Sequence, residues 1–210
     1  MDSLKDSLKE VEDYLSEQLE TREKLLKESR DVISSCSRAI IDVHNGKFPE
    51  AEKEMKSARK LLDPLKKSRD SLLSRYLISP ETELVEASCV LALVKGRPVP
   101  AREALGASPE AYLHGLLDTV GELKRLVLDS IMKGDLSSAR RHFDSMQQLY
   151  SSCSPLAVYD HVANGTRRKI DVARMLVEDT RGIITEEIRR ESVESSMRRL
   201  DKMLRRARDH

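Results

Sequence analysis

Apolar residues recur every three or four positions along the first 43 residues, with no proline or glycine among them. This spacing predicts one long helix that ends at Asn45-Gly46. Pro49 then falls in the first turn of a second helix, which runs to about Leu77 and is expected to kink at Pro64. Ser79 is an N-cap residue and Pro80 follows it at the first helical position. This pair predicts the start of a third helix, which ends at Gly96.

The second half of the chain repeats these signals. A short helical turn is expected over 101–105, a long helix from Ser108-Pro109 to Gly134, and a helix capped by Asp135 that reaches about Tyr150. A short helical stretch to Val162 and a helix from Thr166 to about Arg181 follow. From Thr185 onward one face is apolar, which predicts an amphipathic C-terminal helix that packs on the domain or on a neighbouring subunit; its apolar residues are Ile188, Val193, Met197, Leu200, Leu204 and Ala207. The expected division is a helical domain over 1–185 and this helix over 186–210.

The composition favours the same all-α fold and excludes several classes of protein. The chain has no Trp, two Phe and five Tyr, so strand formers are scarce. At 210 residues it is long enough for one substantial core. No apolar run approaches the roughly 20 residues of a membrane span, and the three cysteines lack the spacing of a zinc site or a disulfide framework. We therefore expect a single-domain cytoplasmic protein with reduced thiols and no membrane contact.

Two pairs of acidic residues stand in otherwise apolar helical segments. Glu83 and Glu86 are three residues apart at the start of a segment that is apolar or small to Val94, and Asp118 and Glu122 are one turn apart among leucines and valines. Each pair shares a helix face, and carboxylates in apolar surroundings need a compensating cation or proton. Oxygen ligands favour Mg²⁺ or Mn²⁺. The alternative is ion pairing with arginines such as Arg30, Arg38 or Arg125, and we interpret His114 as an ordinary helix residue.

Net charge is only +1, so any nucleic-acid surface has to be local. Candidate phosphate ligands are Arg22, Arg30, Arg38 and His44 in the first helix and Arg167-Arg168-Lys169 at the start of a late helix; a solvated basic face is the alternative for each. The P-loop, GxGxxG, GxSxG and HExxH patterns are absent from the sequence, which excludes these nucleotide-binding, hydrolase and zinc-protease motifs.

Several segments resemble one known family. The run from Thr82 to Ala87 is similar to the signature with paired glutamates of translin-associated factor X, and the run from Tyr112 to Arg125 resembles the segment of that family which reads DYLLG-x-x-DLTGEL-x-R. Asp129-Ser130 with Gly134-Asp135 resembles a further NS-x-x-x-GD motif. Because translin itself lacks the acidic pair, the chain resembles the factor-X-like, catalytic branch of the translin family.

The resemblance implies a seven-helix bundle of long antiparallel helices that assembles into a hollow homo-oligomer, commonly an octamer, with a Mg²⁺-dependent endoribonuclease site inside. Carried over by position, Glu83, Glu86 and Asp118 match the catalytic, metal-binding acids, and Glu122 is a fourth metal ligand. The expected substrate is single-stranded or short duplex RNA. The alternatives are a non-catalytic oligomeric scaffold that binds RNA or single-stranded DNA, and a helical adaptor that recruits a protein through its C-terminal helix.

Overall fold

The computed structural model describes residues 2–67 and 74–208, and these are all-α, with seven α-helices, two short 3₁₀ segments and no strand. The chain divides into two compact units, residues 1–115 and 116–210, with the boundary inside helix α5 (Pro109–Met132). No helix in the described ranges combines the length and the apolar character needed to cross a membrane. The predicted fold class is confirmed.

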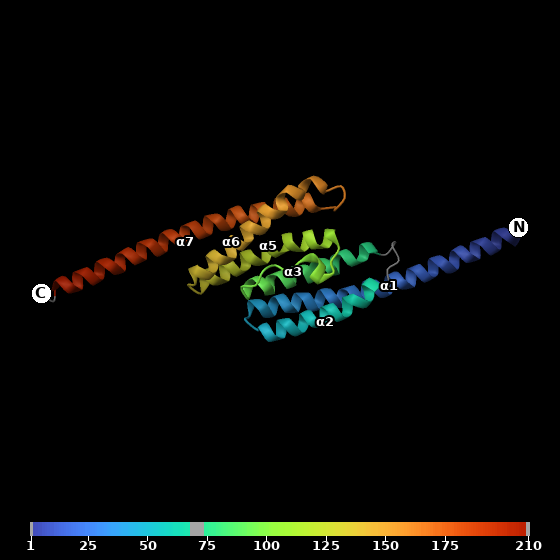
Figure 1. Ribbon diagram of the computed structural model, residues 1–210, viewed down its shortest axis with the longest axis horizontal. Helices are drawn as coiled ribbons and strands as arrows, with labels where there is room; N and C mark the ends of the chain where they lie inside the picture. The colour runs from blue at the N-terminus through green and yellow to red at the C-terminus, as the bar shows by residue number, and fades with distance from the viewer. Residues whose placement is uncertain (1, 68–73, 209–210) are drawn as a thin grey trace. The chain divides into compact units, whose positions relative to one another are not determined.

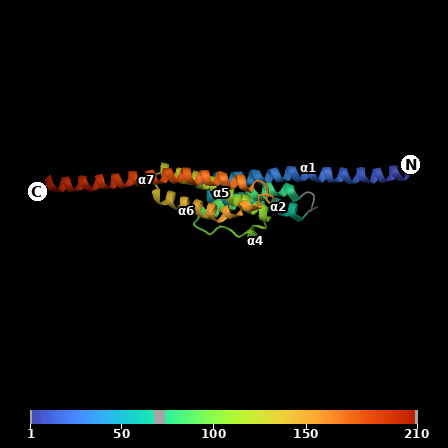
Figure 2. The same cartoon turned by 90° about the horizontal axis from the view of Figure 1, so that it is seen from above.

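The first unit is built on a helical hairpin. Helix α1 (Asp2–His44) turns at 45–47 into α2 (Phe48–Lys67), and the two helices run side by side in opposite directions (Figure 1, Figure 2). Helix α3 (Ile78–Val94) packs against both, preceded by the 3₁₀ segment η1 (Ser74–Leu77). Helix α4 (Arg102–Leu105) and the first turns of α5 complete the unit. Their shared core is apolar and includes Val32, Cys36, Leu62, Val85 and Val90.

Helix α3 is buried on most of its surface, as its apolar sequence predicts, and ten of its residues are buried. Its start differs from the prediction. The helix begins at Ile78, directly after η1, and Leu77 occupies the N-cap position without any side-chain cap, so Ser79 is not the cap. The prediction that the preceding helix continues to Leu77 is also wrong, because residues 74–77 form a 3₁₀ turn; residues 68–73 lie outside the described part.

Gly115 allows a close crossing between α3 and the first turns of α5. A Cβ atom at this position would lie 2.6 Å from the Val85 Cβ and 2.7 Å from the Thr82 carbonyl oxygen. Such distances are far below van der Waals contact, so only glycine fits without displacement of α3. The crossing fixes the segment of α3 that carries Glu83 and Glu86.

The second unit contains the rest of α5, α6 (Leu136–Cys153), η2 (Ser154–Tyr159) and α7 (Thr166–Arg208). Asp135 caps α6 as predicted, since its Oδ1 accepts a hydrogen bond from the Ser138 backbone N–H at 2.9 Å. Helix α7 is continuous over 43 residues, so the predicted helix end near Arg181 is wrong. Gly182 does not interrupt it, because the helical stripe that packs in the core continues on both sides of that residue; its buried members are Thr166, Ile170, Ala173, Val177, Thr180 and Ile184.

Candidate functional site

Glu83 and Glu86 form the acidic pair of the first unit. Both side chains are partly buried, whereas their neighbours Leu84 and Val85 are fully buried. Both acids act on Cys36 of α1: burial raises the pKa of the Cys36 thiol to about 12, and the negative charges of Glu83 and Glu86 add to that rise. Two carboxylates therefore lie beside an apolar core, where a compensating cation would be stabilised.

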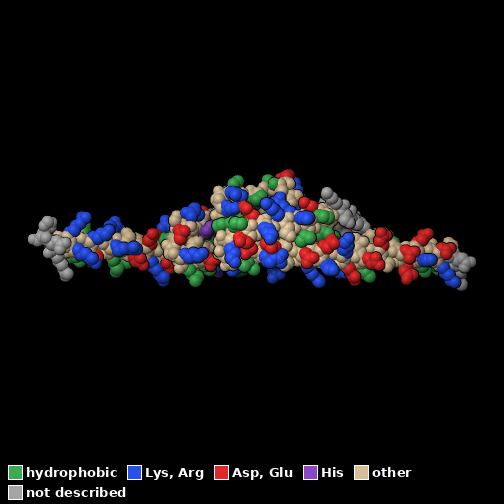
Figure 3. Space-filling model, turned by 90° about the horizontal axis from the view of Figure 1, so that it is seen from below, with side chains coloured by type: hydrophobic (Ala, Val, Ile, Leu, Met, Phe, Trp, Pro, Cys, Tyr) green, Lys and Arg blue, Asp and Glu red, His purple; other side chains and the backbone are tan. Residues whose placement is uncertain are grey.

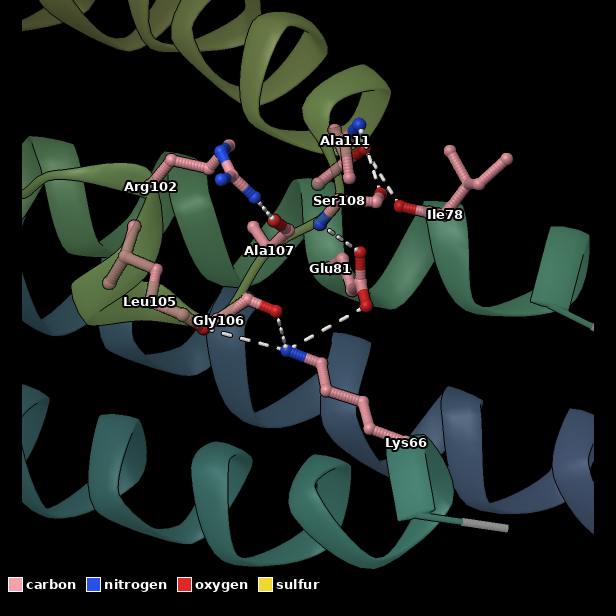
Figure 4. A network of polar contacts seen from close by, with 10 residues as sticks. Lys66, Ile78, Glu81, Arg102, Leu105, Gly106, Ala107, Ser108 and Ala111 are labelled. Carbon is pink, nitrogen blue, oxygen red and sulfur yellow. Dashed lines mark hydrogen bonds and ion pairs between the residues drawn. The ribbon is translucent and has the colours of Figure 1, made fainter. Parts of the chain in front are cut away.

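Glu81 is the most deeply buried acid of α3, and the sequence analysis missed it. Its side chain is 1% exposed. The Oε2 atom accepts a hydrogen bond from the Ser108 backbone N–H at 2.7 Å, and the Oε1 atom lies 3.7 Å from the Lys66 Nζ (Figure 4). Lys66 also donates to the Gly106 carbonyl at 2.9 Å. Glu81 thus ties α2, α3 and the segment before α5 together, which is a structural role.

One sequence signal could have identified Glu81. It shares the spacing of the buried positions Val85 and Ser88, so it lies on the helix face that packs in the core. Its place directly after Ser79-Pro80 is one where acids are common for a purely local reason, the first turn of a helix.

Asp118 and Glu122 form the acidic pair of the second unit, and each has a cation beside it. The Lys169 Nζ donates to both carboxylate oxygens of Asp118, at 2.5 and 2.6 Å. Glu122 Oε2 lies 4.0 Å from the Arg125 guanidinium, as the ion-pair alternative anticipated. Lys169 is 51 residues from Asp118, so local spacing gave no sign of this contact. Asp118 is therefore compensated by a side chain of the same unit.

The two acidic pairs belong to different units. Within either unit, the described residues include no group of three His, Cys, Asp or Glu side chains gathered as metal ligands. The oxygen donors of Glu83 and Glu86 suit a hard divalent cation. Two ligands from one helix are fewer than such a cation takes, so further oxygens from other residues, water or a phosphate would be needed to complete its shell.

The predicted phosphate ligands differ in how they are engaged. Arg38 contacts Glu54 at 2.8 Å and also donates to Ser34 and Ser35. Its guanidinium therefore links α1 to α2. Arg30 on α1 and Arg167 and Arg168 at the start of α7 are exposed, and His44 is partly buried. The backbone N–H of Arg167 donates to the Asp160 Oδ1 at 2.9 Å, a bond that does not involve the arginine side chain.

The comparisons with known proteins agree on one family. The model of the translin family matches residues 71–180. An uncharacterized protein of Methanocaldococcus jannaschii is 30% identical over 184 residues, which cover 85% of this chain and 82% of the relative.

Solved structures give the same result. The structure of AfC3PO with duplex RNA has a TM-score of 0.78 and 31% identity, over 86% of this chain and 95% of that one. The apo form of NeC3PO has a TM-score of 0.73 at 21% identity, over 85% and 95% of the two chains, which shows a common fold. The family model matches residues 71–180 of the 210, and the relative of 30% identity covers 85% of the chain. The chain therefore belongs to the translin family.

Proposed function

We propose that this protein is a Mg²⁺- or Mn²⁺-dependent endoribonuclease that binds single-stranded or short duplex RNA and acts as a homo-oligomer, of which an octamer is the expected form. RNA binding is supported by the 31% identity to a C3PO protein solved with duplex RNA. The observation that carries the catalytic part is the pair Glu83 and Glu86, two partly buried carboxylates three residues apart on one face of a largely buried helix.

The carboxylates that we propose as ligands of Mg²⁺ or Mn²⁺ are Glu83 and Glu86 in the first unit, and Asp118, with Glu122 as a fourth, in the second unit. When bound, such a cation supplies Lewis-acid polarisation of the scissile phosphate and activation of a water molecule. The chain's own part is to hold these oxygens in place. Gly115 and the Glu81 contacts fix the start of α3, and the two hydrogen bonds from Lys169 orient the carboxylate of Asp118.

Exposed arginines supply the contacts that hold the RNA backbone. Arg30, Arg167 and Arg168 present guanidinium groups to solvent, and a planar guanidinium donates two parallel hydrogen bonds to a phosphate. These contacts are made to phosphates, which are the same in every RNA sequence, so binding is expected to tolerate many sequences.

A non-catalytic scaffold of the translin type, which binds RNA or single-stranded DNA, is the second candidate. One observation favours it: Asp118 is already compensated by Lys169, and Glu122 lies near Arg125, as expected for acids with a purely structural role. The two candidates make the same prediction for binding and opposite predictions for cleavage.

The test is incubation of the purified full-length protein with end-labelled single-stranded RNA, duplex RNA and single-stranded DNA, with Mg²⁺, Mn²⁺ or EDTA. We expect RNA fragments with either metal and intact RNA with EDTA, while a gel-shift measurement shows RNA bound in all three conditions. RNA that is bound but intact with both metals would support the scaffold. Absence of RNA binding would contradict both candidates.

A further inference from the structure

Helix α1 carries a packing stripe that continues beyond the core of its unit. Positions on one face of α1 follow one another in alternating steps of four and three residues from Leu4 to Val43. In the second half of the helix the residues at these positions are buried, as at Leu25, Val32 and Cys36. In the first half the same register is apolar and exposed from Leu4 to Leu15, and then passes through the polar, partly buried Gln18 and Arg22. The exposed apolar members form what we name the α1 stripe, and they are 51 to 60% exposed: Leu4, Leu8, Val11 and Leu15. A regular heptad stripe of this kind is typical of a helix that pairs with another helix.

Helix α7 has a matching feature in its last four turns. The apolar positions again follow alternating steps of four and three, and they are 55 to 65% exposed. We name them the α7 stripe: Val193, Met197, Leu200 and Leu204. At 1.5 Å per residue, the segments 2–23 and 193–208 extend about 33 and 24 Å, so the shorter can pair along its whole length.

The two segments carry opposite charge. Residues 2–23 contain eight Asp and Glu against three Lys and Arg, whereas residues 193–208 contain six Lys and Arg against two Asp and Glu. Figure 3 shows acidic side chains predominating along the first segment and basic side chains along the second. Pairing of either segment with its own kind would bring like charges together, so the charges select the pairing of unlike segments.

We propose that residues 2–23 of one copy pair with residues 193–208 of a second copy, stripe against stripe, and that this contact helps to build the oligomer. The inference deepens the assembly part of the proposed function and does not depend on cleavage. Because each chain offers one segment of each kind, every copy can make two such contacts, either with one partner across a two-fold axis or with two partners in a closed ring.

The first test uses substitutions in the full-length protein. Leu8→Gln with Leu15→Gln on α1, and Met197→Gln with Leu204→Gln on α7, keep the charge and remove apolar contact from exposed positions, so folding should be retained. We expect each pair to raise the concentration at which the oligomer forms by roughly 100-fold, because apolar burial at the contact is lost. The matched controls, Ser3→Gln with Ser16→Gln and Ser192→Gln with Ser195→Gln, lie away from the stripes and should assemble like the parent.

The second test identifies the partner by charge reversal and mixing. One variant carries Glu10→Lys, Glu12→Lys and Glu23→Lys, and the other carries Arg198→Glu, Arg205→Glu and Arg208→Glu, which are among the charged residues nearer to each stripe. Each alone has two segments of like charge and should assemble poorly. An equimolar mixture should recover the parent's mass by light scattering, because each reversed segment then meets an opposite charge on the other chain.

Several outcomes would overturn the inference. They are an unchanged mass for both stripe variants, loss of assembly from only one of the two stripes, and a mixture that does not recover, as expected if the segments pair within one chain. Loss of RNA binding with unchanged mass would assign the basic segment to RNA instead. Since the same samples can be assayed for RNA cleavage, failure of this contact is distinguishable from failure of the proposed function.

Discussion

Lys169 holds both carboxylate oxygens of Asp118, at 2.5 and 2.6 Å, and so joins the first turn of α7 to the middle of α5. The two side chains are 29 and 33% exposed, so the pair lies at the edge of the core and not within it. An acid that we expect to hold a metal is thereby oriented by a lysine of its own unit. Its contribution to folding and its contribution to catalysis can be measured separately.

For folding, we predict a modest coupling between these two residues. In a double-mutant cycle of Asp118→Asn and Lys169→Gln, followed by urea unfolding, the coupling free energy should be about 0.5–1 kcal/mol, as expected for a partly exposed ion pair. The same cycle on the more exposed pair Glu194 and Arg198 should give a value near zero. A coupling above ~3 kcal/mol would instead indicate a fully desolvated pair.

Two helical glycines should respond to alanine with opposite signs. Gly115→Ala places a methyl group 2.6 Å from the Val85 Cβ and is expected to lower the free energy of unfolding by about 1–3 kcal/mol. Gly182→Ala has open space around it on α7 and should raise that free energy by about 0.5–1 kcal/mol through helix propensity. Urea unfolding of both variants, compared with the parent, tests these two predictions. A neutral Gly115→Ala would show that α3 and α5 can separate without cost.

The long helices were predictable because their apolar spacing is local information. The C-terminal ends of α1 and α3, and the caps at Ser108 and Asp135, follow from residues within a few positions of each end, whereas the start of α3 does not. The break expected near Arg181 was wrong because glycine in a long packed helix costs only about 1 kcal/mol, which packing on both sides of it outweighs.

The environment of each acid was less predictable, because it depends on contacts distant in sequence. Glu81 is buried through contacts with Lys66 and Ser108, and Asp118 is paired with Lys169; neither relationship appears in the helical spacing. The partial burial of Glu83 and Glu86 could be inferred, since almost every other position around them on α3 is apolar. Their role in metal binding and catalysis stays a prediction.

Two buried thiols should make stability fall in alkaline solution. Burial raises the pKa of Cys36 to about 12, with the charges of Glu83 and Glu86 adding to it, and burial raises the pKa of Cys153 to about 11, against an ordinary value of 9.0. As the pH rises, the unfolded chain therefore loses these protons before the folded protein does. The stability that the protonated thiols contribute to the folded protein is complete below about pH 9, and above it the free energy of unfolding falls by ~1.4 kcal/mol per pH unit for each thiol.

The measurement is the free energy of unfolding in urea between pH 8 and 10.5, for the parent and for a variant with Cys36→Ala and Cys153→Ala. The variant will be less stable overall, so the slope against pH is the quantity to compare, and it should be shallower than that of the parent. Parallel slopes would show that the thiols ionise as readily in the folded protein as in the unfolded chain.

RNA affinity should depend on the exposed arginines at the start of α7. Replacing Arg167 and Arg168 by Ala is expected to weaken binding of all RNA sequences alike and to reduce the slope of log affinity against log salt by about 0.7–0.9 for each lost phosphate contact. Arg38→Ala should have a smaller effect, because that guanidinium is engaged by Glu54, Ser34 and Ser35. If the affinity and the salt slope of the α7 variant match those of the parent, these arginines are a solvated face.

The most direct measurement is the rate of RNA cleavage with Mg²⁺ by the amide variants Glu83→Gln, Glu86→Gln and Asp118→Asn, beside Glu110→Gln as a control acid on α5. Each amide keeps the side-chain volume and removes the charge, so folding and RNA binding should be retained. We predict that cleavage falls at least ~100-fold in the first three variants, as expected when electrostatic stabilisation at the reacting phosphate is lost, and is unchanged in the control. Cleavage at the parent's rate in a variant with both Glu86→Gln and Asp118→Asn would contradict the proposed role of these acids.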